Sequence, residues 1–467
     1  MQDEASQTLL APLPFRNADD EVSPEFVEAV SAAIEAADGA RLRVLTEDLH
    51  ESDLGALVEA LPHDHRPRLV ELLGRDFDFA ALTEVDDAVR EDILEELETE
   101  TVAEGVKELD SDDAVAILED LDEQDKAEVL EQLPPGDRIV LQRQLDYPEG
   151  SAGRLMQTDV IAVAPFWTVG QTIDFMRDTP DLPDIFYEIF VVDPTHKLVG
   201  AVFLDRLLRT KRPVRMDEIL ADEVHKVRAT DDREEVARLF KQYNLVSAPV
   251  IDDYERLVGV VMHDDILDVV EEQVDQDLRA LGGVKAEEEL SDKVLFITKS
   301  RFAWLFVNLM TAFLASLVLK GFEDELQKMV ALAVLAPIVA SQGGNAATQT
   351  MTVAVRALAT RELSSSNRMR VISRELLVGL LNGLAFAVIT GSIAALWFGT
   401  FDLGVVIGIA MIINLLAAAL AGILIPLAID RFDADPAVAS GPFVTTVTDI
   451  VGFFSFLGTA TLWFGLK

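Results

Sequence analysis

Asp449 is an acidic residue in the middle of the last long apolar segment of the chain, Pro442–Leu466. A carboxylate at membrane depth costs about 2.5–3.5 kcal/mol or more, so it normally faces a water-filled path or a bound cation. The polar residues nearest to it all carry hydroxyl groups: Thr445, Thr446, Thr448 and Ser455. This group predicts an ion site in a membrane pore. The alternative is a protonated or paired carboxyl inside a helix bundle.

A second set of polar residues follows an apolar run that ends at Pro337. This proline and a pair of glycines after it are expected to interrupt a helix and to free backbone carbonyls. Membranes tolerate such an interruption only where the chain faces protein or water. We therefore expect Asn345, the backbone of Gly344 and the side chain of Thr448 to line the same path as Asp449. The alternative is a polar loop that ends a short helix.

Five apolar stretches follow residue 300, and four of them reach the length of about 20 residues that spans a bilayer. They lie near Phe302–Leu319, Met329–Ala340, Leu376–Phe398, Leu403–Ile429 and Pro442–Leu466, the second being the short one. Basic residues gather before the first stretch, between the second and third, and between the fourth and fifth: Lys299, Arg301, Arg356, Arg361, Arg368, Arg370, Arg374 and Arg431. Positive charge marks the cytoplasmic side. We therefore expect a multi-pass protein of the cell (inner) membrane, with residues 1–300 in the cytoplasm and Lys467 outside.

The charge of the 467-residue chain is divided unevenly. Up to residue 290 the chain carries 27 Lys and Arg against 71 Asp and Glu, whereas the remainder carries 12 against 11. Such acidity argues against a nucleic-acid partner, because phosphate binding needs clusters of Lys and Arg. It suggests cation binding, a salty habitat, or both. The chain has no cysteine, which excludes disulfides and thiolate metal sites.

Residues 40–146 contain a twelve-residue repeat, marked by an apolar residue at each step: Leu49, Leu61, Leu73, Val85, Leu97, Leu109, Leu121, Leu133 and Leu145. In one continuous helix, this step would turn the leucines around the axis instead of forming a stripe. The repeat therefore predicts short helices that are joined by tight turns and stacked into a superhelix.

Residues 149–270 change in character, because short β-branched strands alternate with amphipathic helices in two successive copies. The first copy is expected to comprise Val160–Val163, Val169–Arg177, Glu188–Val192 and Leu198–Phe203, and the second Val224–Ala229, Arg233–Tyr243, Ala248–Ile251 and Leu257–Met262. Each copy has a strand, an Asp-containing turn and a Leu-Val-Gly step into the next strand. This duplication resembles a tandem pair of CBS domains. Such pairs are regulatory modules that bind adenine nucleotides or metal ions and dimerise.

The order of these parts predicts a multidomain membrane protein. We expect a polar tail in residues 1–40, an all-α acidic superhelical N domain in 41–147, α/β tandem CBS domains in 148–270, a connecting (plug) helix and linker in 271–298, and a five-helix α transmembrane domain in 299–467. The whole resembles the MgtE family of magnesium channels. The most specific residues are Pro337 with Gly343-Gly344-Asn345 and Gln349, Arg356–Glu362, Asp435-Pro436, and Thr448-Asp449.

The resemblance implies a homodimer in the lipid bilayer that conducts Mg²⁺ into the cytoplasm, with Asp449 of each subunit as the central pore ligand. It also implies gating by cytoplasmic Mg²⁺, which binds acids of the N and CBS domains and holds the pore closed: Asp265, Asp268, Glu234, and Asp112 or Asp113. The chemistry agrees, because Mg²⁺ sheds water reluctantly and is held by few carboxylates. Conduction also needs binding weak enough to allow fast exit.

Several positions depart from the family's pattern. Asn244, Gln273 and Gln276 stand where the family commonly has acids, so some inhibitory ion sites are expected to be weak or absent. Asp205-Arg206 reverses the Arg-Asp order associated with the family's nucleotide pocket, which leaves ATP binding an open question.

Other functions compete with the channel. A secondary transporter or exchanger of divalent cations (Mg²⁺, Co²⁺, Mn²⁺) usually needs more than one intramembrane ionisable group. Only Asp449 lies well inside a span, with Glu375 at an edge. A membrane-anchored sensor would need neither Asp449 nor an interrupted second segment. The sequence has no nucleophile–base pair, phosphate loop or metalloenzyme motif, so we expect no enzyme.

Overall fold

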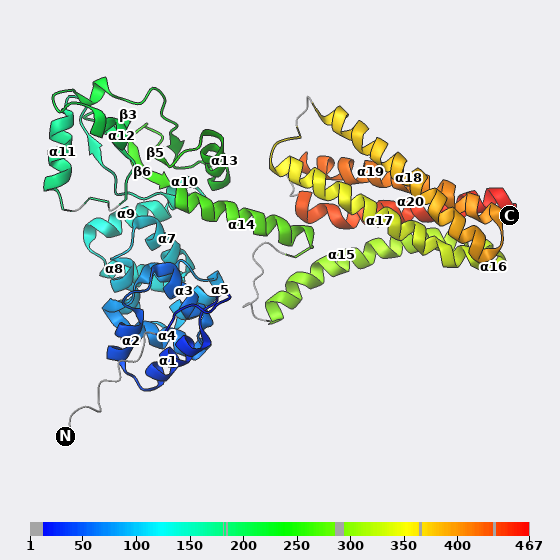
Figure 1. Ribbon diagram of the computed structural model, residues 1–467, viewed down its shortest axis with the longest axis horizontal. Helices are drawn as coiled ribbons and strands as arrows, with labels where there is room; N and C mark the ends of the chain where they lie inside the picture. The colour runs from blue at the N-terminus through cyan, green and yellow to red at the C-terminus, as the bar shows by residue number, and fades with distance from the viewer. Residues whose placement is uncertain are drawn as a thin grey trace. The chain divides into compact units, whose positions relative to one another are not determined.

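The computed structural model describes residues 13–180, 182–183, 185–284, 294–363, 367–432 and 436–466. Asp435 of the family pattern and the C-terminal Lys467 lie outside the described residues. The chain forms two compact units, Met1–Gln273 and Val274–Lys467, whose elements are labelled in Figure 1. The first unit holds the N-terminal helices and the two β-containing copies, and the second holds the long apolar helices.

Short helices fill the N-terminal part of the first unit, as the twelve-residue repeat predicts. They are α1 (Pro24–Glu35), α2 (Gly39–Thr46), α3 (Glu51–Ala60), α4 (Arg66–Leu73), α5 (Asp87–Glu96), α6 (Thr99–Val106), α7 (Ser111–Asp120), α8 (Glu123–Gln132) and α9 (Pro135–Leu145), with 3₁₀ turns η1 (His63–His65), η2 (Gly74–Asp76) and η3 (Phe79–Leu82). The repeat residues Leu61, Leu97 and Leu121 directly follow α3, α5 and α7, and they are 2%, 8% and 8% exposed. Each of these three residues therefore ends a helix by entering the apolar core that the stacked helices share.

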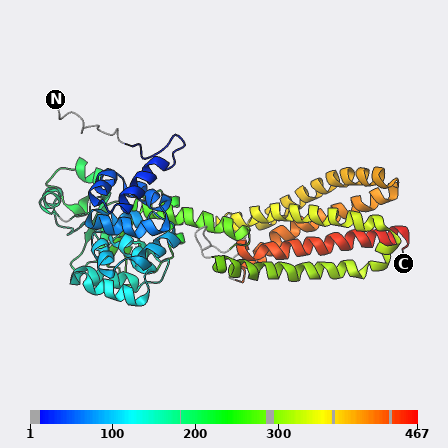
Figure 2. The same cartoon turned by 90° about the horizontal axis from the view of Figure 1, so that it is seen from below.

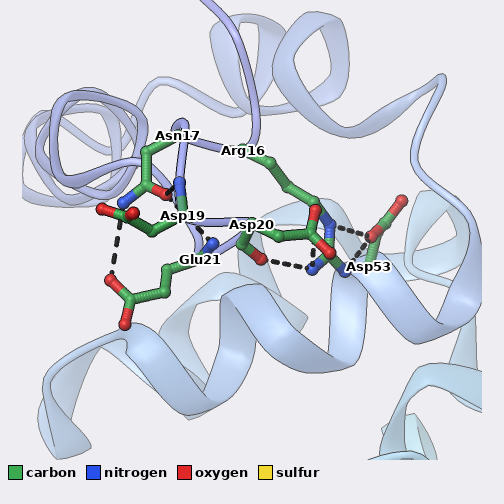
Figure 3. Close-up of polar contacts among 6 residues, drawn as sticks. All are labelled: Arg16, Asn17, Asp19, Asp20, Glu21 and Asp53. Carbon is green, nitrogen blue, oxygen red and sulfur yellow. Dashed lines mark hydrogen bonds and ion pairs between the residues drawn. The ribbon is translucent and has the colours of Figure 1, made fainter.

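A tight turn precedes α1 and is held against α3 (Figure 3). The side-chain oxygen of Asn17 accepts hydrogen bonds from the amides of Asp19 at 2.8 Å and Glu21 at 3.1 Å. Arg16 donates to Asp53 of α3, with Nη2 2.6 Å from Oδ1. Because this ion pair is exposed to solvent, it adds little to stability, and its effect is to fix where the turn lies.

The two predicted copies are present with the same topology. The first contains β1 (Ala162–Val163), α11 (Val169–Asp178), β2 (Glu188–Val192) and β3 (Leu198–Phe203), and the second contains β4 (Val227–Arg228), α13 (Arg233–Tyr243), β5 (Ser247–Ile251) and β6 (Leu257–Met262). The remaining elements are α10 (Ala152–Leu155), α12 (Leu204–Arg209) and η4 (Met216–Glu218). In each sheet the first strand pairs parallel with the second, and the second pairs antiparallel with the third. The first strand of each copy is shorter than predicted.

The Asp-containing turns of the two copies match in detail. Asp193 Oδ1 accepts a hydrogen bond from the amide of Lys197 at 3.0 Å, and Asp252 Oδ1 accepts one from the amide of Arg256 at 2.9 Å. Both sheets also shift register at the residue just before these turns. The predicted duplication is therefore confirmed.

The connecting helix α14 (His263–Leu281) follows β6 directly and so begins before residue 271, the first residue predicted for the connecting segment. Its last residues belong to the second unit. There Ala280 is buried in a cluster with Met351, Val355 and Val444 of the membrane helices. The end of α14 is thus fixed by apolar contacts to the segments that carry the candidate pore residues.

Within the described residues, the second unit contains five helices that are long and apolar enough to cross a membrane. They are α15 (Val294–Gly321), α17 (Val330–Ala359), α18 (Arg368–Phe398), α19 (Phe401–Asp430) and α20 (Pro436–Phe464), with the short α16 (Glu323–Lys328) between the first two. Figure 2 shows the long helices running side by side. Helix α19 contacts α17, α18 and α20, whereas α15 packs on α20. The core of this unit therefore forms around α19.

Two predictions about the second membrane segment are wrong. The segment is not short, since α17 has 30 residues, and it continues as a helix through Pro337 and the glycine pair. Pro337 lacks an amide hydrogen, so only the carbonyl of Ala333 loses its helical partner. The glycines stay helical because close packing against neighbouring helices offsets their conformational cost. The backbone carbonyls of Gly343 and Gly344 are therefore not freed for an ion.

Candidate ion sites

One face of α17 is polar and uncovered. Ser341, Asn345, Thr348, Thr352 and Arg356 are all exposed. They are spaced by three or four residues, so they lie along one side of the helix. A membrane helix cannot turn such a stripe toward lipid tails without a large desolvation cost. The stripe therefore faces water or another protein surface. We call these five residues the polar stripe.

Asp449 lies beside the contact between α17 and α20. A Cβ placed on Gly344 of α17 would be 3.9 Å from Thr448 Oγ1 of α20, so the helices approach closely there. Asn345 and Asp449 are the next residues in the two helices, and Asn345 is exposed while Asp449 is half-buried. Among the described residues, no basic side chain forms an ion pair with Asp449. A carboxylate in this position favours a cation as its counter-charge.

Thr448 and the backbone of Gly344 support the helix contact instead of facing outward. Thr448 is fully buried, and its hydroxyl donates to the carbonyl of Thr445 at 2.9 Å. The carbonyl of Gly344 accepts a hydrogen bond from the hydroxyl of Thr348 at 3.0 Å. The prediction that Thr448 and the Gly344 backbone line the ion path is therefore corrected. Asn345 and Asp449 remain the candidates on the open side.

Sequence reasoning missed a buried amide in α19. Asn414 is fully buried, and its Nδ2 donates to the carbonyl of Val339 in α17 at 2.8 Å. Amide side chains commonly join membrane helices in this way. The available signal was one amide inside an otherwise apolar run, Met411–Leu416, directly opposite the conspicuous glycines of α17.

A chain of hydrogen bonds links the N domain to the second CBS copy. The hydroxyl of Ser111, at the start of α7, accepts a hydrogen bond from the amide of Thr158 at 2.8 Å. The neighbouring Gln157 pairs through its backbone with Val260 of β6 at 2.8 Å. Strand β6 leads directly into α14. The first residues of α7 and of α14 are thereby held near each other.

Three predicted regulatory acids meet at this place. Burial, followed by the charge of Asp110, raises the pKa of Asp112 to about 6. Burial, followed by the charge of Asp112, raises the pKa of Asp113 to about 8. The same two causes raise the pKa of Asp265, in the first turn of α14, to about 9. These shifts mean that the acids are close enough to oppose one another's ionisation. The structure therefore brings Asp112, Asp113 and Asp265 together.

Further acids extend this group. Burial, then the charges of Glu84 and Asp264, raise the pKa of Asp268. Asp264 also contributes to the raised pKa of Asp265. Sequence reasoning missed both contributors. Asp264 could have been predicted because it is the neighbour of Asp265. Glu84 is one of many acids in the N domain, and nothing in the sequence distinguishes it from the others. We call Glu84, Asp112, Asp113, Asp264, Asp265 and Asp268 the acidic group.

Glu234 makes a separate contact. It accepts a hydrogen bond from Nε2 of Gln273 at 2.9 Å, and Gln273 lies about 12 Å beyond Asp265 along α14 at the usual rise per residue. Asn244 ends α13 with a left-handed φ of 52°, a conformation that asparagine adopts readily. Two of the residues that depart from the family's pattern, Gln273 and Asn244, therefore have local structural roles.

The acidic group fits a hydrated cation. Within the described residues, no three His, Cys, Asp or Glu side chains are close enough together to hold one metal ion directly. However, Oδ1 of Asp112 is buried without a hydrogen-bond partner there, which leaves an acceptor for a cation or its water. Mg²⁺ usually keeps several waters and binds through one or two carboxylates. The arrangement therefore suits Mg²⁺ held largely through water.

The cleft between the two CBS copies is narrow. The cavity lined by Tyr187, Glu188 and Ser247 has a volume of about 20 Å³, which is room for about one water. Burial raises the pKa of Glu188 to about 7, although Ser247 donates a hydrogen bond to it at 2.8 Å. Arg206 donates to the carbonyl of Leu220 at 2.7 Å. A cavity of this size has no room for an adenine nucleotide.

Known protein families match most of the fold described above. Residues 336–459 match MgtE, described as a divalent cation transporter, residues 49–150 match the MgtE intracellular N domain, and residues 152–212 and 216–272 match the CBS domain. A magnesium transporter MgtE of Thermus thermophilus is 34% identical over 455 residues, which cover 93% of this chain and 97% of that protein. The chain belongs to the MgtE family. The resemblance stated from the sequence is thus confirmed.

Other relatives of this MgtE-family chain cover parts of it. A magnesium transporter MgtE of Enterococcus faecalis is 32% identical over 69% of this chain and 71% of that protein. The solved cytosolic domain of the Mg²⁺ channel MgtE in complex with ATP is 30% identical, with a TM-score of 0.48, over 52% of this chain and 99% of that one. The MgtE match contains Asn345 and Asp449, and the N-domain and CBS matches contain the acidic group.

Proposed function

We propose that this chain is a magnesium channel of the cell membrane, which conducts Mg²⁺ into the cytoplasm as a homodimer. One observation carries the proposal: Asp449, an acid without a basic partner among the described residues, lies beside an uncovered polar stripe on α17. Two copies related by a two-fold axis would turn their stripes toward each other and enclose an aqueous path. The basic residues at one end of the spans favour a cytoplasmic N terminus and an outer C terminus.

Asp449 supplies the charge of the proposed ion site, and neutral groups such as Asn345 supply the rest. Each subunit contributes one carboxylate, so a dication meets two negative charges. An ion that keeps most of its water can pause there and still leave quickly. An inside-negative potential of 100 mV contributes about 4.6 kcal/mol to inward passage of a divalent ion. Inward movement therefore needs no coupled ion.

Cytoplasmic Mg²⁺ is proposed to close the channel at the acidic group. Apart from one another, these carboxyls are ionised at neutral pH, so bringing Asp112, Asp113, Asp265 and Asp268 together without a cation requires either charge repulsion or proton uptake. Both weaken the contact between the N domain and the second CBS copy. A bound cation neutralises them and tightens that contact. The closed state thus gains from its higher affinity for the ion, which is a population shift between two states. Glu234 forms a secondary position, because Gln273 already pairs with it.

The test replaces Asp449 by Asn in the full-length protein reconstituted into liposomes. Asparagine keeps the shape of the side chain but removes both charges from the dimer, so potential-driven Mg²⁺ uptake falls by at least about tenfold. Asp402→Asn is the matched control, because Asp402 is exposed in the first turn of α19. Persistent uptake in D449N would show that the ion passes elsewhere. Uptake that requires a gradient of a second ion, and not a potential, would identify an exchanger.

A further inference from the structure

Asn414 occupies a position where three membrane helices meet. Its Nδ2 donates to the carbonyl of Val339 in α17, and its Oδ1 is buried without a hydrogen-bond partner among the described residues. A buried amide oxygen without a partner is costly, and packing alone would be served better by leucine. An asparagine at this place therefore calls for a functional reason.

The backbones of α17 and α20 approach this amide so closely that any residue larger than glycine would displace it. A Cβ on Gly343 of α17 would lie 2.1 Å from Nδ2 of Asn414. A Cβ on Gly452 of α20 would lie 2.8 Å from the same atom and 3.2 Å from Cα of Ala340. The space left by these two glycines therefore accommodates the Asn414 side chain. Together they set the distance between α17 and α20.

The contact lies directly behind the proposed ion site. Gly343 precedes Gly344 and Asn345 in α17, and Gly452 lies within one turn of Asp449 in α20. The buried residues Gly343 and Gly452 face Asn414, while Asn345 and Asp449 keep some exposure. A change in the size or polarity of residue 414 would therefore move the two ion-site residues relative to each other.

We propose that Asn414 is a positioning residue for ion selection: it fixes the spacing between Asn345 of α17 and Asp449 of α20. This inference rests on the proposed channel function. Mg²⁺ keeps its waters in a compact, near-ideal octahedral shell, whereas Ca²⁺ takes more ligands at longer and more variable distances. A site held at fixed spacing therefore discriminates between the two ions, and a loosened site loses that discrimination.

The experiment measures Mg²⁺ uptake by the full-length protein in liposomes as a function of Mg²⁺ concentration, with and without competing Ca²⁺. Asn414→Leu keeps the bulk of the side chain but removes the hydrogen bond to Val339. We expect the half-saturating Mg²⁺ concentration to rise about 10-fold to 100-fold, the range found when residues behind a metal site are replaced, and Ca²⁺ to compete better. Thr461→Val is the control, because Thr461 is a buried residue of α20 whose hydroxyl, within the described part of the chain, donates only to the carbonyl of Leu457 in its own helix.

A pair of variants tests the contact itself. Gly343→Ala places a methyl group on Asn414 and is expected to lower uptake. Adding Asn414→Ala to it makes room for that methyl group and is expected to recover part of the uptake. Recovery in the double variant supports the contact, and two independent losses contradict it.

Three outcomes separate this inference from the channel proposal. If N414L keeps the wild-type half-saturating concentration and ion preference, the positioning role is overturned. If N414L only lowers the amount of folded protein, with the remaining protein behaving as wild type, Asn414 is merely structural and the inference is also overturned. If D449N still conducts, the ion does not pass at Asp449 and the proposed ion site fails, whatever Asn414 does.

Discussion

The two units differ in how many carboxylates their candidate Mg²⁺ sites contain. In the membrane unit, Asp449 is the acid deepest within the described spans, and its polar neighbours are neutral. In the first unit, Met1–Gln273, burial and the charge of neighbouring carboxylates raise the pKa values of Asp113 and Asp265 to about 8 and 9. Few charges let a hydrated ion leave quickly, whereas many charges retain it. Under the proposed function, the ion therefore passes at Asp449 and is sensed at the acidic group.

Neutralising the acidic group is expected to have the largest effect, the loss of regulation by internal Mg²⁺. In the double variant Asp113→Asn, Asp265→Asn, the repulsion that opens the contact between the N domain and the CBS pair is absent, and so is the cation site. Internal Mg²⁺ then no longer regulates the channel: a coupling that is typically about 5-fold to 150-fold between linked sites falls to about twofold or less. Flux recorded while internal Mg²⁺ is titrated measures the change.

A variant of the pore acid and a control variant of an unrelated acid test whether this effect is specific to the acidic group. D449N is expected to lose uptake but to keep Mg²⁺-dependent protection of the cytoplasmic unit from trypsin, since the acidic group is intact. Asp217→Asn removes an exposed acid that pairs with Arg215 between β3 of the first copy and β4 of the second and should leave regulation unchanged. Wild-type regulation in the D113N/D265N variant would remove the acidic group from the sensing role.

The binding of Mg²⁺ at the acidic group should also depend on pH. The pKa values of Asp112, Asp113 and Asp265 are raised from their ordinary 3.8 to about 6, 8 and 9. A raised carboxyl pKa means that the folded contact favours the protonated form, so the contact is strongest at low pH and weakens as pH rises through these values. Mg²⁺ should therefore raise the melting temperature of the cytoplasmic unit more at pH 9 than at pH 6.

This expectation is checked by thermal unfolding of the full-length protein in detergent, followed by protease resistance of residues 13–273, at both pH values with and without Mg²⁺. The D113N/D265N variant is the control and should show a much smaller difference between the two pH values. An equal Mg²⁺ effect at pH 6 and pH 9 in the wild type would mean that these carboxyls do not form the cation site.

Patterns that report burial directly were predicted well from the sequence. The repeat residues Leu61, Leu97 and Leu121 ended helices in the core because an apolar residue at a fixed step has one way to be buried. The duplicated turns at Asp193 and Asp252 were predictable because the same side-chain-to-backbone hydrogen bonds shape both. In each case the signal and its physical cause lie within a few residues of each other.

Features that depend on a distant partner were misread. The glycine pair before Asn345 indicated a broken helix, yet α17 is continuous because Gly343 accommodates Asn414 from α19. The sequence offers both meanings of a glycine in a membrane span, and only the neighbouring helix decides between them. Glu84 was missed for the same reason, since its proximity to Asp268 follows from the packing of the N domain.

The smallest expected effect follows from replacing Gln273, an amide at a position where the family commonly has an acid. Gln273 donates to Glu234 at 2.9 Å, so this pair needs no cation. Gln273→Glu replaces the donor by a second carboxylate, and a bound cation would then relieve the repulsion. We expect channel closure at lower internal Mg²⁺, by about fivefold at most, because a partly exposed charge contributes only about 1 kcal/mol. Gln273→Ala removes the hydrogen bond without adding charge; if it shifts closure in the same direction and by as much, the added carboxylate is not the cause, and sensing is confined to the acidic group.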